Sequence, residues 1–135
     1  MVFFSNGDIK KGSDWLKKAA AAGNNRYQYY LGNYYHNLKS ELEGLNEKEN
    51  IKWRKEAFKW YLKSAKNGNA FAQNEIGRYY DDYYYDKVGY DYQYVVSPDY
   101  EQAMYWYMKS FNNNFLGSLK GIEEIFKSPC QGGDF

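Results

Sequence analysis

Histidine, cysteine and proline are scarce in this chain, and the first two scarcities exclude whole classes of site. The 135 residues include one histidine, His36, one cysteine, Cys130, and two prolines. A single cysteine forms no internal disulfide, and one cysteine with one histidine cannot complete a zinc site. Any Ser–His–Asp or Cys–His set would depend on His36, which we place near the end of a helix as a cation-capable side chain. We therefore expect no catalytic residues, no metal site, no cofactor and no enzyme activity.

The chain also lacks a large excess of positive or negative charge, and it has no long run of apolar residues. The chain has 18 basic and 17 acidic residues, a net charge of +1, which gives no overall field that would steer it onto nucleic acid or an anionic membrane. It lacks the run of about 18 apolar residues that a membrane-spanning helix requires. The opening Met1–Gly7 also lacks the basic region of a secretory signal. We expect a cytoplasmic, or otherwise intracellular, protein without membrane insertion.

What the sequence does contain is an internal repeat. Three similar segments begin at Trp15, Trp60 and Trp106. The tryptophans are 45 and 46 residues apart, and the residues that follow each tryptophan are also similar. The later motif starts at Leu31, Ile76 and, more weakly, Ile122. A fixed period of this length is typical of a solenoid, in which each unit stacks on the next.

Each copy predicts a pair of helices. Apolar residues recur at the three- and four-residue spacing of an amphipathic helix, and glycine or asparagine marks the breaks. The sequence thus predicts an all-α superhelix of about three antiparallel pairs, near residues 8–38, 51–82 and 97–127. Residues 1–7 form a lead and 128–135 a tail. Ser97 and Pro98 are expected to start the fifth helix as its cap and first residue.

Two glycines in predicted helices indicate close packing. Gly32 and Gly77 occupy matching places in the first two copies. Each costs about 1 kcal/mol relative to alanine inside a helix. Small residues also match at Ala19, Ser64 and Ser110. We expect tight helix crossings where these residues lie.

The repeated sequence resembles a known family. The second copy reads A-F-K-W-Y-L-K-S-A-K-N-G from Ala57, and the third D-Y-E-Q-A-M-Y-W-Y from Asp99. These segments are similar to the Sel-1-like repeats, relatives of the tetratricopeptide repeat, with the approximate pattern D-Y-x-x-A-x-x-W-Y-x-x-A-A-x-x-G. The resemblance covers most of residues 8–127. It implies an α/α solenoid that acts as a non-catalytic adaptor or scaffold for protein partners.

The chain departs from that family in two ways. The linkers at 39–50 and 81–95 are longer than the family's spacing allows. In the third copy, Phe111, Asn114 and Glu123 stand where Ala, Gly and Gly are expected. Atypical terminal copies are common in solenoids because one of their sides meets water, so the third copy is expected to be a cap.

The second linker alternates tyrosine with polar residues at Tyr90, Tyr92 and Tyr94. This spacing is typical of a strand, and with residues 86–89 as a turn it predicts a small hairpin within 83–96. Tyrosine offers a large, rigid contact area, so the three tyrosines are candidate partner-binding residues. Enrichment by genome composition alone would explain them equally well.

The second helix of each pair carries another stripe that we expect to face solvent on the concave side. Its candidate partner-binding residues are Arg26, Tyr29, Tyr30, Asn33, Asn37, Phe71, Asn74, Glu75, Arg78, Asp82 and Lys120, with Gly117, Gly121 and Glu124 on the same side of the sixth helix. Such side chains suit an extended peptide, since Asn binds backbone, Arg binds carboxylates and Tyr binds apolar groups. An ordinary hydrated helix surface would have the same composition.

Three alternatives stay open at this stage. The tyrosines could stack on the bases of single-stranded nucleic acid, although the sequence shows no basic track for phosphates. The last helix could pair with a second copy of the chain through its apolar side, which comprises Leu119, Ile122, Ile125 and Phe126. The chain could also be part of a longer repeat array. The sequence does not identify a partner.

Overall fold

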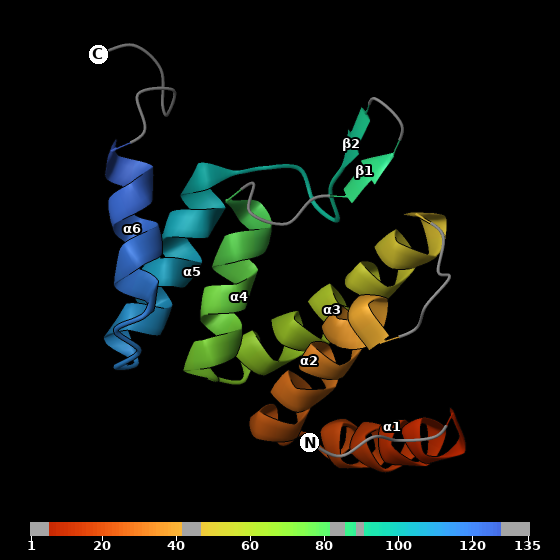
Figure 1. Ribbon diagram of the computed structural model, residues 1–135. Helices are drawn as coiled ribbons and strands as arrows, with labels where there is room; N and C mark the ends of the chain where they lie inside the picture. Colours follow the sequence, from red (N-terminus) through yellow and green to blue (C-terminus); the bar gives the residue numbers. More distant parts are fainter. Residues whose placement is uncertain (1–5, 42–46, 82–85, 89–90, 128–135) are drawn as a thin grey trace.

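The structure is a computed structural model, and it describes residues 6–41, 47–81, 86–88 and 91–127. Within these ranges the chain forms six helices and one two-stranded sheet (Figure 1). In chain order the elements are α1 (Asn6–Ala21), α2 (Asn25–Glu41), α3 (Glu47–Lys66), α4 (Ala70–Tyr80), β1 (Asp86–Val88), β2 (Asp91–Gln93), α5 (Tyr100–Asn112) and α6 (Ser118–Lys127).

Each helix packs against its neighbour in the chain, from α1 on α2 through to α5 on α6. The helices follow one another across the molecule, with α1 and α6 at opposite ends (Figure 1). The expected all-α architecture of three helix pairs is confirmed.

The turn inside each helix pair has the same backbone conformation. Gly23 and Gly68 have φ angles of +97° and +94°, and Asn114 has a φ of 69°. Asparagine adopts this left-handed conformation more readily than most residues other than glycine. Asn114 therefore preserves the turn in the third copy, although it departs from the repeat pattern.

The fifth helix starts later than the sequence suggested. Its N-cap is Asp99, whose carboxylate accepts hydrogen bonds from the backbone N–H groups of Glu101 and Gln102, both at 3.1 Å. The prediction of Ser97 as cap and Pro98 as first helical residue was wrong. An ionised carboxylate accepts these bonds and also interacts favourably with the positive end of the helix dipole, so Asp99 takes the position.

The predicted small hairpin in the second linker is confirmed, but its turn was misplaced. Residues Asp86–Val88 are a strand rather than a turn, and they pair antiparallel with β2 in the register Asp86↔Gln93. β1 lies against α3, which gives this short sheet the support that two strands alone lack. Tyr92 is in β2, Tyr94 follows it and is half-buried, and Tyr90 lies outside the described residues.

The core lies between the helices and combines small residues with tyrosines. Fully buried aromatic rings belong to Tyr61, Tyr79 and Tyr107. A Cβ atom added at Gly32 would lie 2.5 Å from Cδ1 of Tyr61, and one added at Gly77 would lie 2.6 Å from Cδ1 of Tyr107. The expected tight crossings at both glycines are therefore confirmed, because no larger residue leaves room for the ring.

Candidate functional site

Side chains on the first helix of one repeat hold the second helix of the repeat before it. Ser64 Oγ donates a hydrogen bond to the carbonyl of Asn25 at 2.6 Å, and Ser110 Oγ donates to the carbonyl of Ala70 at 2.7 Å. Both serines are fully buried. These bonds fix the first turns of α2 and α4, where several candidate residues lie.

Two buried glutamines complete the same connection. Gln28 Nε2 donates to the carbonyl of Ala20, and Gln28 Oε1 accepts from Asn67 Nδ2 at 3.0 Å. The pattern recurs one repeat later, where Gln73 Nε2 donates to the carbonyl of Ala65 at 3.1 Å. Gln73 Oε1 then accepts from Asn113 Nδ2 at 2.9 Å. Sequence reasoning missed both glutamines, although their 45-residue spacing inside an apolar stripe was a usable signal.

The expected partner-binding stripe is only partly exposed. Its exposed members are Arg26, Tyr30, Asn37, Phe71 and Lys120; its half-buried members are Tyr29, Asn33, Glu75 and Arg78. Asn74 was expected to face solvent, and this was wrong, since it is 4% exposed. α4 packs against three helices, α3, α5 and α6, and so exposes less of its surface than a helix that packs against two neighbours. Asp82 lies outside the described residues.

Some stripe residues are occupied by contacts within the protein. Asn33 Oδ1 accepts a hydrogen bond from the Tyr61 hydroxyl at 2.6 Å. Arg78 Nη1 lies 3.3 Å from Glu75 Oε1 in an ion pair along one helix face. These groups would have to exchange their present partners to bind a ligand. Of the exposed stripe residues, Arg26, Tyr30 and Phe71 lie together around the first turns of α2 and α4.

His36 lies between two repeats rather than at a helix end. Its Nδ1 is 3.3 Å from the hydroxyl oxygen of Tyr79. Since α2 continues to Glu41, the expected position of His36 at the helix terminus was wrong. The ring is half-buried and packs near the rings of Tyr61 and Tyr79, as part of the contact between the first two repeats.

One buried tyrosine has a perturbed pKa. The Tyr107 hydroxyl donates to Asp81 Oδ2 at 2.9 Å. Burial, together with the adjacent Asp81 carboxylate, raises the pKa of Tyr107 far above its usual range, because a phenolate there would be both desolvated and repelled. A Cβ added at Gly121 of α6 would lie 2.5 Å from the same ring, so Gly121 packs inward instead of facing solvent as expected.

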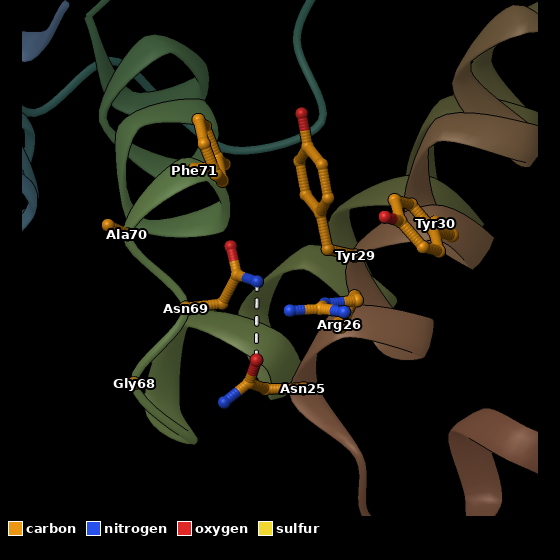
Figure 2. Close-up of a pocket in the computed structure, with 8 residues that line it drawn as sticks. All are labelled: Asn25, Arg26, Tyr29, Tyr30, Gly68, Asn69, Ala70 and Phe71. Atoms are coloured by element: carbon orange, nitrogen blue, oxygen red, sulfur yellow. Dashed lines mark hydrogen bonds between the residues drawn. The ribbon is translucent and has the colours of Figure 1, made fainter. Parts of the chain in front are cut away.

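A cavity opens between the first turns of α2 and α4. Its volume is about 290 Å³, and its lining residues are Asn25, Arg26, Tyr29, Tyr30, Gly68, Asn69, Ala70 and Phe71 (Figure 2). Asn69 Nδ2 donates to Asn25 Oδ1 at 3.3 Å across its base. Small-molecule sites usually measure about 300–1,000 Å³, so this cavity suits one or two side chains rather than a large cofactor.

The cavity wall belongs to a continuous series of aromatic contacts across the three repeats. Tyr29 stacks on Phe71 with ring centroids 5.7 Å apart, and the two rings face each other in Figure 2. Phe71 in turn lies 4.9 Å from Phe115, and Tyr29 lies 6.0 Å from Tyr30. The series continues through Tyr27 to Trp15. We call these six residues the aromatic track.

Metal and membrane features are absent from the part of the chain that the structure describes. No three His, Cys, Asp or Glu side chains gather there in a way that could hold a metal ion. None of the described helices combines the length and the apolar character that crossing a membrane would need.

Comparison with known proteins shows a similarity to a solved structure. No protein-family model matches the chain, and no curated protein matches it. The chain is similar to the crystal structure of a Sel1 repeat protein from Oxalobacter formigenes, with 21% sequence identity and a TM-score of 0.45. The match covers 93% of this chain and 58% of that protein, so the chain spans less than two thirds of its length. The repeated turns, glycine contacts and hydrogen bonds described above define the solenoid independently of this similarity.

Proposed function

We propose that this protein is a non-catalytic adaptor or scaffold that binds a protein or an extended peptide through the surface formed by α2 and α4. We place this surface on the concave side of the solenoid. The single observation that carries the proposal is the exposure of large aromatic side chains there. Tyr30 is 46% exposed and Phe71 is 52% exposed, and both belong to the aromatic track.

Exposed aromatic rings on a fixed backbone favour partner binding. Tyrosine and phenylalanine bury a large area on association while few rotatable bonds are immobilised. Here the rings are held by helices whose first turns are fixed by Ser64 and Ser110. A partner would therefore meet a surface that needs little ordering, which lowers the free-energy cost of association.

Selection from a library of displayed random peptides tests the proposal. The peptides recovered with the wild-type protein are measured by fluorescence anisotropy against the double variant Tyr30→Ser/Phe71→Ser. Loss of two exposed aromatic contacts should weaken binding at least about tenfold. Asn74 is unsuitable as a test residue because it is buried, and its replacement would report on folding.

The matched control is Tyr105→Ser/Met108→Ser, which removes two similarly exposed side chains from α5. This control should keep the wild-type affinity. Far-ultraviolet circular dichroism and thermal melting establish that each variant folds. Recovery of no peptide, or equal affinity of the Tyr30/Phe71 variant and the wild type, would refute binding at this surface.

A second candidate function is self-association through the third repeat. Leu116 is 72% exposed and Phe126 is 79% exposed, and Leu119 between them is also exposed. Leu119 occupies the place that the glutamines Gln28 and Gln73 have in the earlier copies. This end therefore offers an apolar contact where the other repeats offer an amide, which favours a homodimer through α6.

Light scattering at two protein concentrations tests the second candidate. The wild-type mass should rise with concentration, and Phe126→Ser should remain monomeric. Trp15→Ser, which replaces an exposed aromatic residue at the other end of the array, is the control and should still associate. A wild-type mass that stays at 16.0 kDa at both concentrations would rule the homodimer out.

A further inference from the structure

The cavity between α2 and α4 has one charged lining residue, Arg26, and no acidic one. Arg26 is exposed and belongs to the first turn of α2, where its backbone N–H donates to Asn24 Oδ1 at 2.9 Å. The same Asn24 oxygen accepts from the N–H of Tyr27. This capping contact holds the backbone of Arg26, and its side chain extends from α2 toward Asn69 in Figure 2.

The remaining walls are aromatic or amide groups. Tyr29 and Tyr30 follow Arg26 on α2, and Phe71 faces Tyr29 from α4 (Figure 2). A planar guanidinium binds a carboxylate through two parallel hydrogen bonds, and the rings accept flat apolar groups. The lining therefore combines a site for one negative charge with a site for an aromatic side chain.

We propose that this cavity selects an acidic side chain, Asp or Glu, that lies two residues from an aromatic side chain in an extended peptide. Side chains two residues apart in an extended chain lie on the same face, about 6.6 Å apart. The carboxylate binds Arg26, and the aromatic side chain packs against Phe71 and Tyr30. This inference rests on the proposed function, because it names the peptide chemistry that the same surface recognises.

Single-stranded nucleic acid fits this cavity less well than an acidic peptide does. Successive phosphates need a row of cations, and the cavity lining provides only Arg26. At the equivalent place between the second and third repeats, Phe71 takes the position that Arg26 has in the first repeat, and its ring centroid lies 4.9 Å from that of Phe115. The single positive charge of Arg26 therefore matches one carboxylate rather than a row of phosphates.

Nuclear magnetic resonance titration of the ¹⁵N-labelled protein tests the inference. The probes are acetyl-Phe-Ala-Glu-Ala-Phe-amide and its Gln counterpart, which place the aromatic residue on both sides of the central side chain. The Glu probe should shift the backbone signals of Arg26, Tyr29 and Phe71 with a dissociation constant in the millimolar range, as one small contact allows. The Gln probe should bind about fivefold more weakly, since it lacks the charge.

The variant Arg26→Gln should bind both probes equally, and the control Lys59→Gln, the same charge change on exposed α3 surface, should keep the preference for Glu. Equal binding of the two probes by the wild type, a preference that survives Arg26→Gln, or signal shifts outside the cavity would overturn the inference. The inference can fail while the proposed function holds. If the library yields peptides that depend on Tyr30 and Phe71 but contain no acidic residue, only the acidic preference is wrong.

Discussion

The ring of Tyr61 on α3 packs directly on the backbone of Gly32 on α2, where an added Cβ would lie 2.5 Å from Cδ1 and 2.7 Å from Cε1. Tyr61 is 1% exposed, so its ring has no open space into which it could move. The contact recurs one repeat later between Gly77 and Tyr107. Close backbone approach through glycine is thus the way in which successive repeats come together.

Gly32→Ala should destabilise the protein by about 1–2 kcal/mol, measured by urea unfolding. Overpacking a filled core typically costs about 1–3 kcal/mol, and the better helix propensity of alanine offsets up to about 1 kcal/mol of that. The cost should fall in a Tyr61→Leu background, which removes the ring, and persist in Tyr61→Phe, which keeps it. An equal cost in both backgrounds would contradict the ring contact as the cause.

Gln73→Met should destabilise the protein by about 2 kcal/mol at nearly constant side-chain volume. The substitution leaves the carbonyl of Ala65 and the amide of Asn113 without the hydrogen bonds that Gln73 makes to them. The control is Gln102→Met, at an exposed position of α5, which should change the unfolding free energy by less than about 0.5 kcal/mol. Similar unfolding midpoints for the two variants would show that the buried amide does not connect the repeats.

Asp99→Ala should cost about 1 kcal/mol of unfolding free energy, because α5 loses the cap that satisfies two of its backbone N–H groups. Ser97→Ala should have almost no effect, since Ser97 is exposed and precedes the cap. Thermal unfolding of both variants makes the comparison. A larger loss from Ser97→Ala than from Asp99→Ala would restore Ser97 as the start signal.

The raised pKa of Tyr107 predicts a loss of stability at alkaline pH. In the folded protein Tyr107 keeps its proton, whereas in the unfolded chain tyrosine ionises near pH 10. The unfolded state therefore releases this proton first, and the stabilisation present below about pH 10 is lost above it, by at most about 1.4 kcal/mol per pH unit. Tyr107→Phe lacks this effect, so its stability should fall less steeply.

Urea unfolding between about pH 8 and about pH 11.5 measures the difference in unfolding free energy between the wild type and Tyr107→Phe. Tyr107→Phe should be less stable than the wild type near pH 8, because the hydrogen bond to Asp81 is lost, and the gap should narrow above about pH 10. Tyr105→Phe, at an exposed tyrosine next to the buried Trp106, is the control for replacing a tyrosine by phenylalanine in the same helix. A difference in unfolding free energy between Tyr107→Phe and the wild type that stays constant with pH would argue against burial of a protonated phenol.

The sequence predicted the helix pairs well because both signals, the apolar period and the helix-ending glycines, are local. Gly32 and Gly77 were identified because a glycine inside a helix is unfavourable unless space demands it. Ser97 was mistaken for the cap since serine–proline–aspartate offers two capping residues within three positions. Which one accepts the N–H groups depends on where the chain leaves α4, and Asp99 N–H is itself bonded to the carbonyl of Tyr80.

The candidate site was harder to predict, because exposure depends on which helices surround a residue. Asn74 and Phe71 lie on the same helix, yet one is buried and the other is exposed, and helical spacing does not distinguish a covered polar side from an open one. The cavity also uses Asn25 and Asn69, residues at the helix starts that carry no periodic signal. Its position follows from the close approach of two segments, 25–30 and 68–71, that are distant in the chain.

The middle repeat carries both halves of the connection between units. Ser64 near the end of α3 and Asn67 just after it bind the preceding repeat. Ala70 and Gln73 at the start of α4 accept hydrogen bonds from the following one. A duplicate of residues 51–96 would therefore find matching donors and acceptors on its own copy. This chain thus contains a self-complementary module from which longer arrays could be built by insertion.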